Sequence, residues 1–395
     1  MAKNLKTILV SFFLVLLIGV AFGGGFWFGQ EQCEVCPPSE VDMSLFWEAW
    51  NTLHEKHVDA DQLKEQDLIY GAISGMTESL DDPYTTFMEP SDAKRFRENV
   101  SGDFEGVGME IGLREGQLQV ISPLDGTPAD KAGFKPGDLI LKVNGSSTQG
   151  FTTEQAVERI RGPKGSTVTL TVAREGWEEA KPIEVERATI EVPSMDWEMK
   201  EDNIAYIELK HFTENLSASF RKAALEISKK EVDGIVLDLR NNPGGYLSVA
   251  QDIGGWFLEK NEVIAIEDFG DDRDDKKYKS KGPGTFSDLP VVVLINQGSA
   301  SASEILSGAL RDQRGIKLIG KKSFGKGSVQ KLSRLEGDSS LKVTVAKWLT
   351  PKGNLIADKG LEPNIKVEMT EEDYKNQEDP QLEKALEVIN NLINN

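Results

Sequence analysis

The segment GIVLDLRNNPGG, residues 234–245, decides the fold of the largest part of this chain. Its first half is a nearly continuous apolar run, which is typical of a short strand buried on both faces of a parallel sheet. Its second half contains a proline and two glycines, which end the strand in a tight turn. The apolar run VVVLI at 291–295 repeats the strand pattern and leads through small residues into a helical pattern. Strand, turn and helix in this order predict an α/β domain.

Outward from this segment, strand and helix patterns alternate from about residue 190 to 367. Such alternation predicts βαβ crossovers around a mainly parallel sheet. We expect the charged segment 268–287 to be a mobile, solvated loop, and the tail at 379–395 to form a short amphipathic helix. The expected strands are 204–209, 234–239, 291–295 and 316–319, and the expected helices are 217–228, 247–258 and 303–312.

A separate strand-rich module is predicted at residues 103–187. Turn signals such as Asn144-Gly145 separate its short strand patterns, and one helix is expected at 153–161. Glycines before the first strand let consecutive backbone N–H groups converge on an anion. An exposed strand edge beside that loop can pair with an extended peptide, so the module is predicted to capture a carboxyl terminus. The candidate peptide-binding residues are Gly106, Val107, Gly108, Met109, Glu110 and Ile111.

The amino terminus carries an uncharged stretch from Thr7 to Gln30 with a continuously apolar centre. About 22 helical residues span roughly 33 Å, which is enough to cross the hydrocarbon core of a bilayer. Lysines precede this stretch and glutamates follow it, so the positive-inside rule places the remaining chain outside the cytoplasm. We expect residues 1–30 to be a retained membrane anchor. A cleaved signal peptide, which would leave a secreted protein, is the alternative.

Cys33 and Cys36 form a C-x-x-C pair in the following stalk, residues 31–41. C-x-x-C is a redox motif when it opens a helix in a βαβ unit. Here two prolines follow it directly, so a local or intermolecular disulfide in an oxidising compartment is the favoured interpretation. Helical patterns at 43–58 and 62–80 then predict an amino-terminal helical region at 42–102.

Composition excludes several classes of function. The chain has 395 residues and a formal net charge of −20. This charge would repel a phosphate backbone, so no nucleic-acid partner is expected. Two cysteines and three histidines leave too few ligands for a zinc finger or a histidine-based metal site. We expect neither a metal nor a cofactor.

Three serines alternate with alanines after the strand at 291–295, namely Ser299, Ser301 and Ser303. Each is a candidate nucleophile, because strand-end turns in α/β sheets are where ligand sites form. Ser301 and Glu304 also fit S-x-x-E, the pattern of a capping box. A helix cap without any chemistry is therefore the structural alternative for Ser301.

Lys326 is the candidate base, because none of the three histidines is a convincing partner for a serine. A lysine accepts a proton only when it is neutral, so its pKa must fall from about 10.4 to about 7–8. Burial lowers a lysine pKa by up to about 3–5 units, which is sufficient. Gln330 could accept a hydrogen bond from the amine without adding a charge. The backbone amides of Ala302, Gly244 and Gly245 are candidate donors of an oxyanion hole.

These motifs resemble those of the carboxyl-terminal processing peptidases, which are tail-specific serine proteases with a PDZ domain. The resemblance rests on DLRNNPGG at 238–245, GSASASEI at 298–305 and FGKGSVQ at 324–330, and on the PDZ-like glycine and turn motifs of the strand-rich module. It implies that Ser301 is the nucleophile, Lys326 the general base and Gln330 the positioning partner of the lysine. The family's spacing between serine and lysine selects Ser301 among the three serines.

The resemblance also implies an α+β multidomain fold, with a crotonase- or ClpP-like α/β protease core and an inserted PDZ domain. Family members cut exported proteins near an apolar carboxyl terminus, so substrates with such tails are the expected partners. Both dimeric and self-compartmentalised members exist, which leaves open whether this chain forms a homo-oligomer. The expected organisation is an anchor at 1–30, a stalk at 31–41, a helical region at 42–102, a PDZ domain at 103–187, a protease core at 188–370 and a tail at 371–395.

Two other functions fit parts of the sequence. The segment from Gly320 to Lys326 matches G-x-x-x-x-G-K, but Gly327 replaces the Ser or Thr that a nucleotide-binding P-loop needs for magnesium. A strand pattern also follows where a P-loop requires a helix. The second alternative is a catalytically silent PDZ scaffold at the membrane, which the intact Ser301, Lys326 and Gln330 disfavour.

Overall fold

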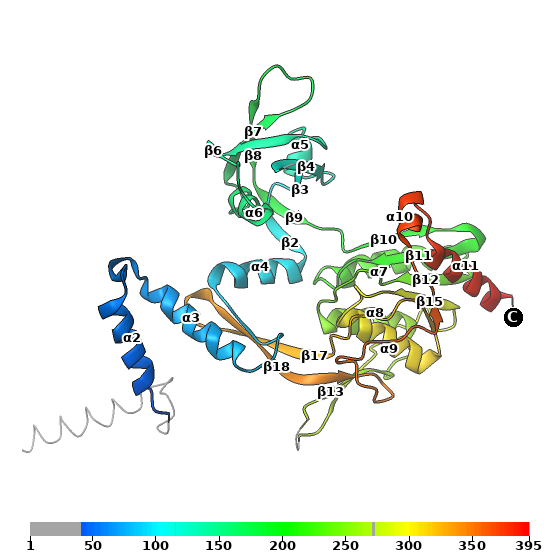
Figure 1. Ribbon diagram of the computed structural model, residues 1–395. Helices are drawn as coiled ribbons and strands as arrows, with labels where there is room; N and C mark the ends of the chain where they lie inside the picture. The colour runs from blue at the N-terminus through cyan, green and yellow to red at the C-terminus, as the bar shows by residue number, and fades with distance from the viewer. Residues whose placement is uncertain (1–40, 115, 271–272, 395) are drawn as a thin grey trace, which may run out of the picture. The chain divides into compact units, whose positions relative to one another are not determined.

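The computed structural model describes residues 41–114, 116–270 and 273–394 (Figure 1). The predicted anchor at 1–30 and the pair Cys33 and Cys36 lie outside these ranges. Within them, no helix is long and apolar enough to cross a bilayer. The described chain divides between Ala72 and Ile73 into two compact units.

The amino-terminal unit is helical, as the sequence pattern indicates. It contains α2 (Ser44–Lys56), the short 3-10 helix η1 (Ala60–Gln62) and the first half of α3 (Glu65–Glu78). The rest of α3 belongs to the second unit, and it leads into β1 (Thr86–Met88) and α4 (Pro90–Ser101).

A six-stranded mixed sheet forms the main core of the second unit, in the order β10-β11-β12-β15-β16-β19. Only the pair β10 and β11 is antiparallel, and every other neighbouring pair is parallel. The apolar runs predicted as buried strands form its two central strands. The strands are β10 (Met195–Met199), β11 (Ile204–Leu209), β12 (Gly234–Asp238), β15 (Val291–Ile295), β16 (Lys317–Gly320) and β19 (Ile365–Lys366).

Helices cover both faces of this sheet (Figure 1). Side chains alternate between the faces, because successive residues of a strand point to opposite sides. Ile235 and Leu237 pack with α7 (Leu216–Ile227), α8 (Leu247–Phe257) and α9 (Ala302–Arg314), whereas Val236 packs with α11 (Pro380–Ile393). The predicted tail helix at 379–395 is thus part of the core, and α10 (Glu371–Asn376) precedes it.

A partly buried ion-pair network joins the tail helix to the end of β12. Arg240 donates to both carboxylate oxygens of Asp238 and of Asp379, and to Gln381. Burial alone disfavours the charge, but the two carboxylates outweigh it and raise the pKa of the Arg240 guanidinium. Tyr206 donates a hydrogen bond of 2.7 Å to Asp238. The network fixes the backbone at the point where the glycine turn begins.

A second, antiparallel sheet contains β1, β18, β13 and β14, with β17 paired to β18. The strands are β13 (Val263–Asp268), β14 (Lys276–Lys279), β17 (Ser328–Arg334) and β18 (Ser340–Leu349), and the short helix η3 (Glu336–Asp338) joins the last two. β17 follows Lys326 where a P-loop requires a helix, so the structure contradicts the nucleotide-site alternative.

The expectation of a loop over 268–287 is wrong at residues 276–279, which form β14. β14 pairs with β13 there, and Phe286 lies in the core. The Tyr278 hydroxyl donates to Glu267 at 2.7 Å, and its ring contacts Trp348. The sequence pattern does not indicate β14, because most residues of this segment are charged. Its apolar contacts come from single residues and not from a continuous apolar run.

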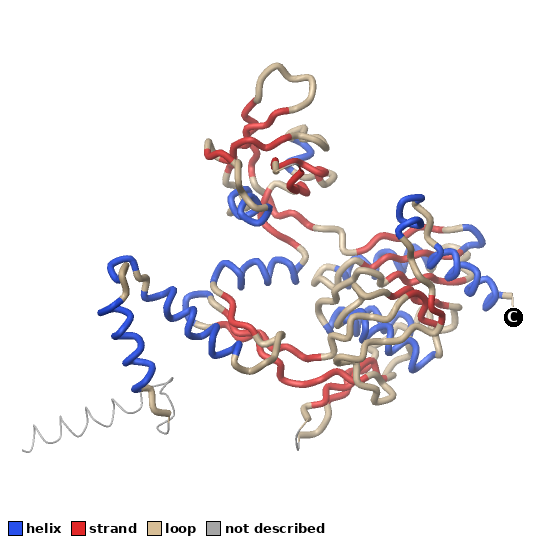
Figure 2. The backbone as a smooth tube through the Cα atoms, viewed as in Figure 1, coloured by secondary structure: helices blue, strands red, loops and turns tan. Residues whose placement is uncertain are grey.

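The strand-rich module consists mainly of strands, with short helices between them (Figure 2). Its sheet has the order β3-β4-β5-β7-β8, with β6 paired to β5. A two-stranded sheet of β2 (Asp103–Gly106) and β9 (Ala188–Glu191) joins the two ends of the module. The other elements are β3 (Met109–Arg114), β4 (Gln117–Pro123), α5 (Pro128–Lys131), β5 (Leu139–Val143), β6 (Ser146–Ser147), α6 (Thr153–Ile160), β7 (Thr167–Ala173) and β8 (Lys181–Glu186), and η2 (Glu201–Asn203) lies between β10 and β11.

Candidate active site

Ser301 lies on a strained turn between β15 and α9. Its backbone has φ 55° and ψ −115°, a region that residues other than glycine rarely adopt. A usual N-cap residue has β-region angles instead. Strain of this kind costs of order 1–3 kcal/mol, and it persists only where the surroundings over-determine the conformation. Ser301 therefore begins the helix in a geometry that capping alone does not require.

The structure separates the three candidate serines. Ser299 is fully buried, and its hydroxyl donates to the carbonyl of Leu239 at 2.7 Å. The hydroxyl of buried Ser303 donates to the carbonyl of Asn242 at 2.9 Å. Ser301, between them, is partly exposed. Two of the hydroxyls thus hold the two strand-end turns together, and the Ser301 side chain lies within reach of solvent.

Glu304 connects the turn of Ser301 to the loop of Lys326. Its Oε2 accepts hydrogen bonds from the backbone N–H groups of both Ser301 and Lys326, each at 2.9 Å. Its Oε1 accepts from the Ser323 hydroxyl at 2.6 Å and from the Gly325 N–H at 2.7 Å. Because one oxygen binds both backbones, the candidate nucleophile and base are adjacent in space although 25 positions separate them.

The Glu304 carboxylate is fully buried, and burial raises the pKa of this group in spite of its four donors. The sequence predicts Glu304 only as the acidic residue of a capping box. Its bond to the Ser301 N–H is the hydrogen bond that such a box requires from this residue. The bonds to the second loop had no signal in the sequence, because they join residues that are 19 to 22 positions apart.

The surroundings of Lys326 shift the pKa of its amine in the direction that a lysine base requires. Burial lowers the pKa of its amine, and the nearby positive charge of Lys342 lowers it further, whereas Glu304 acts in the opposite direction. The amine lies 5.6 Å from the centre of the Tyr84 ring. Among the described residues, the hydrogen bonds include none from this amine to Ser301 or to Gln330. Catalytic hydrogen bonds are often long in structures without substrate.

Gln330 lies near the base but has another partner. Its side-chain amide donates to the hydroxyl of Ser328 at 2.5 Å and to the Ser328 carbonyl at 3.1 Å. The expected bond between the Lys326 amine and the Gln330 carbonyl oxygen is thus absent from the hydrogen bonds of the described residues. Gln330 lies in β17, whereas Lys326 precedes this strand.

The predicted oxyanion turn lies directly against the candidate nucleophile. A Cβ at Gly244 would lie 2.7 Å from the Cβ of Ser301 and 2.9 Å from the Ala302 nitrogen. No side chain fits there, and the φ of Gly244 is 98°. The Gly244 N–H donates to Asn242 Oδ1 at 2.9 Å, whereas Gly245 pairs with Phe212. Ala302 begins α9, so its N–H has no acceptor within the helix.

The strand-rich module contains an apolar groove between β3 and α6. Within the described part of the chain, β3 pairs with β4 alone and is therefore an edge strand of its sheet. The groove is next to the glycine loop, and the Val107 side chain is buried beneath it. Its lining residues are Phe104, Val107, Gly108, Met109, Ile111, Val157, Ile160 and Arg161. Of the six predicted peptide-binding residues, Gly106 and Glu110 do not line it, and Glu110 is exposed on a paired position opposite Ser122.

Comparison with known proteins identifies these features. The family model of peptidase family S41 matches residues 203–367, which contain Ser301, Glu304 and Lys326. A carboxy-terminal processing protease CtpA of Bacillus subtilis is 36% identical over 374 residues, covering 92% of this chain and 78% of the relative. The chain belongs to peptidase family S41.

Other matches extend over the remaining S41 chain. A PDZ domain model matches residues 119–174, and a model of the amino-terminal domain of the activating protease CtpB matches residues 30–92. A probable CtpA-like serine protease of Staphylococcus haemolyticus is 39% identical over 315 residues; the match covers 79% of this chain but only 63% of that relative. The resemblance to carboxyl-terminal processing peptidases is thereby confirmed.

A solved structure of a putative S41 protease from Bacteroides fragilis has the same fold. It matches 90% of this chain and 99% of that chain, with a TM-score of 0.53 and 17% identity. At this sequence identity, the match supports the arrangement of helices and strands but not the role of any residue.

Removal of the Glu304 carboxylate is expected to impair the S41 site strongly. Glu304→Ala leaves four donors without their acceptor, and each of the two buried ones, from Ser323 and Gly325, costs about 1–3 kcal/mol when it stays unsatisfied. We expect a large fall in thermal stability and a fall in kcat of at least about tenfold. Glu304→Gln keeps the shape and one acceptor oxygen, so it should lose less of both. Equal activity of Glu304→Ala and the unsubstituted protein would contradict the role assigned to this carboxylate.

Proposed function

We propose that this chain is a serine endopeptidase that cleaves exported proteins near an apolar carboxyl terminus, with Ser301 as nucleophile and Lys326 as general base. The observation that carries the proposal is the single oxygen of Glu304 that binds the backbones of both residues. The PDZ match and the curated relatives support capture of a peptide tail before cleavage. A crotonase- or ClpP-like description of the core is consistent with its mainly parallel sheet and its second, antiparallel sheet.

In the proposed reaction, the neutral Lys326 amine accepts the hydroxyl proton of Ser301 while the serine oxygen attacks the peptide carbonyl. The resulting ammonium then gives this proton to the leaving amine, and an acyl-enzyme remains. Water attacks the ester carbonyl and transfers a proton to the same amine. The proton returns to the serine oxygen when the carboxyl product leaves, so the enzyme is regenerated.

The negative oxygen of each tetrahedral intermediate needs donors beside Ser301. The Ala302 N–H at the start of α9 and the Gly245 N–H are the donors in this proposal. Gly244 contributes by having no side chain, which would fill the space next to Ser301. In its productive rotamer, Gln330 accepts a hydrogen bond from the Lys326 amine and fixes the direction of its lone pair.

The PDZ groove is proposed to bind the substrate tail as an additional strand on the free edge of β3. Main-chain hydrogen bonds would hold the tail, and the N–H groups of the glycine loop would bind its carboxylate. The apolar lining of the groove favours an apolar last residue. The proposed location outside the cytoplasm rests on the apolar stretch at residues 8–22 and the lysines before it.

The proposal is tested with an unfolded protein that ends in an apolar residue. We expect the full chain to cleave it, and we expect amidation of the tail to raise KM about tenfold with little change in kcat. Ile111→Glu places a charge in the groove and should raise KM similarly. Leu113→Glu is the matched control, because Leu113 is exposed on the same strand and is not among the lining residues.

Each outcome has a clear meaning for the proposed function. Absence of cleavage with intact tail binding would favour the catalytically silent scaffold. Cleavage that is independent of the tail and of Ile111 would leave the peptidase assignment intact and contradict capture by the PDZ groove.

A further inference from the structure

The turn that follows α3 is fixed against the antiparallel sheet near Lys326. Asp82 accepts hydrogen bonds from the Tyr84 N–H at 3.0 Å and from the Thr85 hydroxyl at 2.6 Å. The Thr85 hydroxyl oxygen in turn accepts from the Thr344 N–H of β18 at 3.1 Å. Thr344 is the register partner of Gln330 on β17. A side chain on this turn is therefore fixed relative to the strand that carries Gln330.

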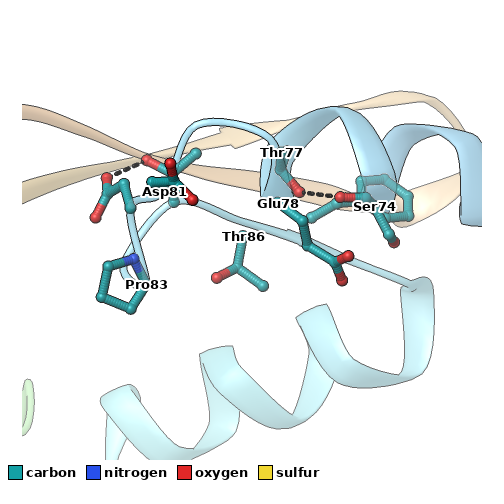
Figure 3. Close-up of a pocket in the computed structure, with 9 residues that line it drawn as sticks. Ser74, Thr77, Glu78, Asp81, Pro83 and Thr86 are labelled. Atoms are coloured by element: carbon teal, nitrogen blue, oxygen red, sulfur yellow. Dashed lines mark hydrogen bonds between the residues drawn. The ribbon is translucent and has the colours of Figure 1, made fainter.

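The turn also borders an open cavity of about 500 Å³ between α3 and β1 (Figure 3). Asp81, Pro83 and Thr86 line this cavity, together with Thr77 and Glu78 from the end of α3. Tyr84 is not among the lining residues. The ring of Tyr84 lies beside the Lys326 amine instead.

We propose that Tyr84 is a positioning residue for Lys326, whose ring supports the ammonium ion that forms when the lysine takes the proton of Ser301. This inference rests on the proposed function, which assigns that proton transfer. A cation within about 6 Å of an aromatic ring centre is attracted by the ring face, and here the distance is 5.6 Å. The attraction acts on the ammonium and hardly at all on the neutral amine. The ring therefore stabilises the charge that appears during the reaction.

Tyr84 lies in the part of the chain that matches the amino-terminal domain of CtpB, residues 30–92. The other groups of the site come from the protease core, between Gly244 and Gln330. If Tyr84 supports the ammonium ion, the segment at residues 30–92 contributes a side chain to the catalytic site.

Several charged groups act on the same two side chains. Lys342 of β18 and Glu304 of α9 face the Lys326 amine, with opposite effects on its pKa. Burial raises the pKa of the Tyr84 phenol, and the carboxylates of Asp358, Glu304 and Asp82, which face it, raise this pKa further, so the ring stays neutral. Substitutions at position 84 that leave all of these groups in place isolate the effect of the ring.

Two substitutions separate the ring from the hydroxyl and from simple packing. Tyr84→Phe keeps the aromatic face, whereas Tyr84→Leu keeps an apolar side chain and loses the face. In Tyr84→Leu the ammonium loses its support, so we expect the pH at which activity rises to move down by about half a unit. A shift of half a pKa unit is about a threefold change in the protonation equilibrium, and we expect the loss of a cation–π contact to cause a shift of this size. We expect kcat at the plateau to fall about threefold, with KM unchanged. Tyr84→Phe should keep the original profile.

Tyr278→Leu is the matched control. It removes a tyrosine ring 4.7 Å from the amine of Lys276 on β14, which belongs to the same sheet as β18. We expect this substitution to leave the pH profile of cleavage unchanged. Thermal unfolding of all three variants shows whether each one folds.

A second measurement does not depend on cleavage. In the full chain with Ser301→Ala, NMR of labelled lysine follows the titration of the Lys326 amine, and Lys326→Arg assigns its signal. The pKa of this amine should be lower when Tyr84→Leu is added than when Tyr84 is retained or Tyr84→Phe is added. Equal values, a higher value in Tyr84→Leu, or a similar shift in Tyr84→Phe would overturn the inference. Because this readout remains when no substrate is cut, failure of the proposed function is distinguishable from failure of the inference.

Discussion

Ser301→Ala is expected to abolish peptide-bond cleavage, with a fall in kcat/KM of at least about a thousandfold. The substitution removes the only atom that forms the acyl bond in the proposed mechanism, and a triad enzyme without its nucleophile loses a comparable factor or more. The fold should persist, because the Ser301 side chain is partly exposed and Glu304 binds its backbone N–H rather than its hydroxyl. The measurement is steady-state cleavage of a tailed substrate, with circular dichroism as evidence of folding.

Ser299→Ala is the matched control for the nucleophile, and Ser303→Ala is a second one. Each removes a buried hydroxyl that binds a carbonyl of the neighbouring strand-end turn. A lost hydrogen bond of this kind costs about 1 kcal/mol of stability, with the carbonyl left unsatisfied as an additional cost. We expect lower unfolding temperatures and activity within about tenfold of the unsubstituted chain. If Ser299→Ala were inactive while Ser301→Ala cut normally, the nucleophile assignment would be wrong.

Lys326→Ala is expected to lower kcat by about 10²- to 10⁴-fold, which is the usual contribution of a positioned general base. Lys326→Arg should be almost as inactive, because a guanidinium keeps its proton and cannot accept another. Lys322→Ala is the matched control on the same loop. Lys322 is exposed and pairs with Glu362 at 3.5 Å, so its loss should leave kcat unchanged. Full activity of Lys326→Ala would exclude the serine–lysine pair.

The pH dependence of cleavage follows from the direction of the Lys326 pKa shift. Burial and Lys342 lower this pKa, so the amine loses its proton at a lower pH than an exposed lysine does. Only the neutral amine accepts the proton of Ser301, so kcat/KM should increase as the pH rises through the lowered pKa and then reach a plateau. The measurement is kcat/KM from about pH 5 to 9, a range that brackets the pKa at which a lysine base operates. A flat profile over this range would contradict a lysine base.

Local patterns predicted most of the secondary structure. The buried strands, the glycine turn after β12 and the helix after Ser301 follow from apolar runs, turn residues and periodicity, all of which lie within about a dozen positions. The strand-rich module was predictable for the same reason. β14 was missed because its stabilising contacts, from Tyr278 to Glu267 and Trp348, join residues distant in sequence.

The candidate site was predictable as a set of groups and not as an arrangement. Residue types and motif order indicated Ser301, Lys326 and Gln330, together with the glycines of the turn. They did not indicate that Glu304 binds both loops, that the Gln330 amide binds Ser328, or that Tyr84 lies beside the base. Each of these depends on how side chains orient after the sheets have packed.

Residue type and short-range spacing were sufficient to predict the buried strands, the turns of the chain and the hydroxyl and amine groups of the candidate site. The tertiary structure alone decided which of three serines is accessible, which carboxylate holds the two loops, and that Arg240 joins the tail helix to the core. The contact between Arg240 and Asp379, for example, joins segments that are 139 positions apart. The number of residues between two such segments does not predict how far apart they lie in space, because that distance depends on how the intervening chain folds.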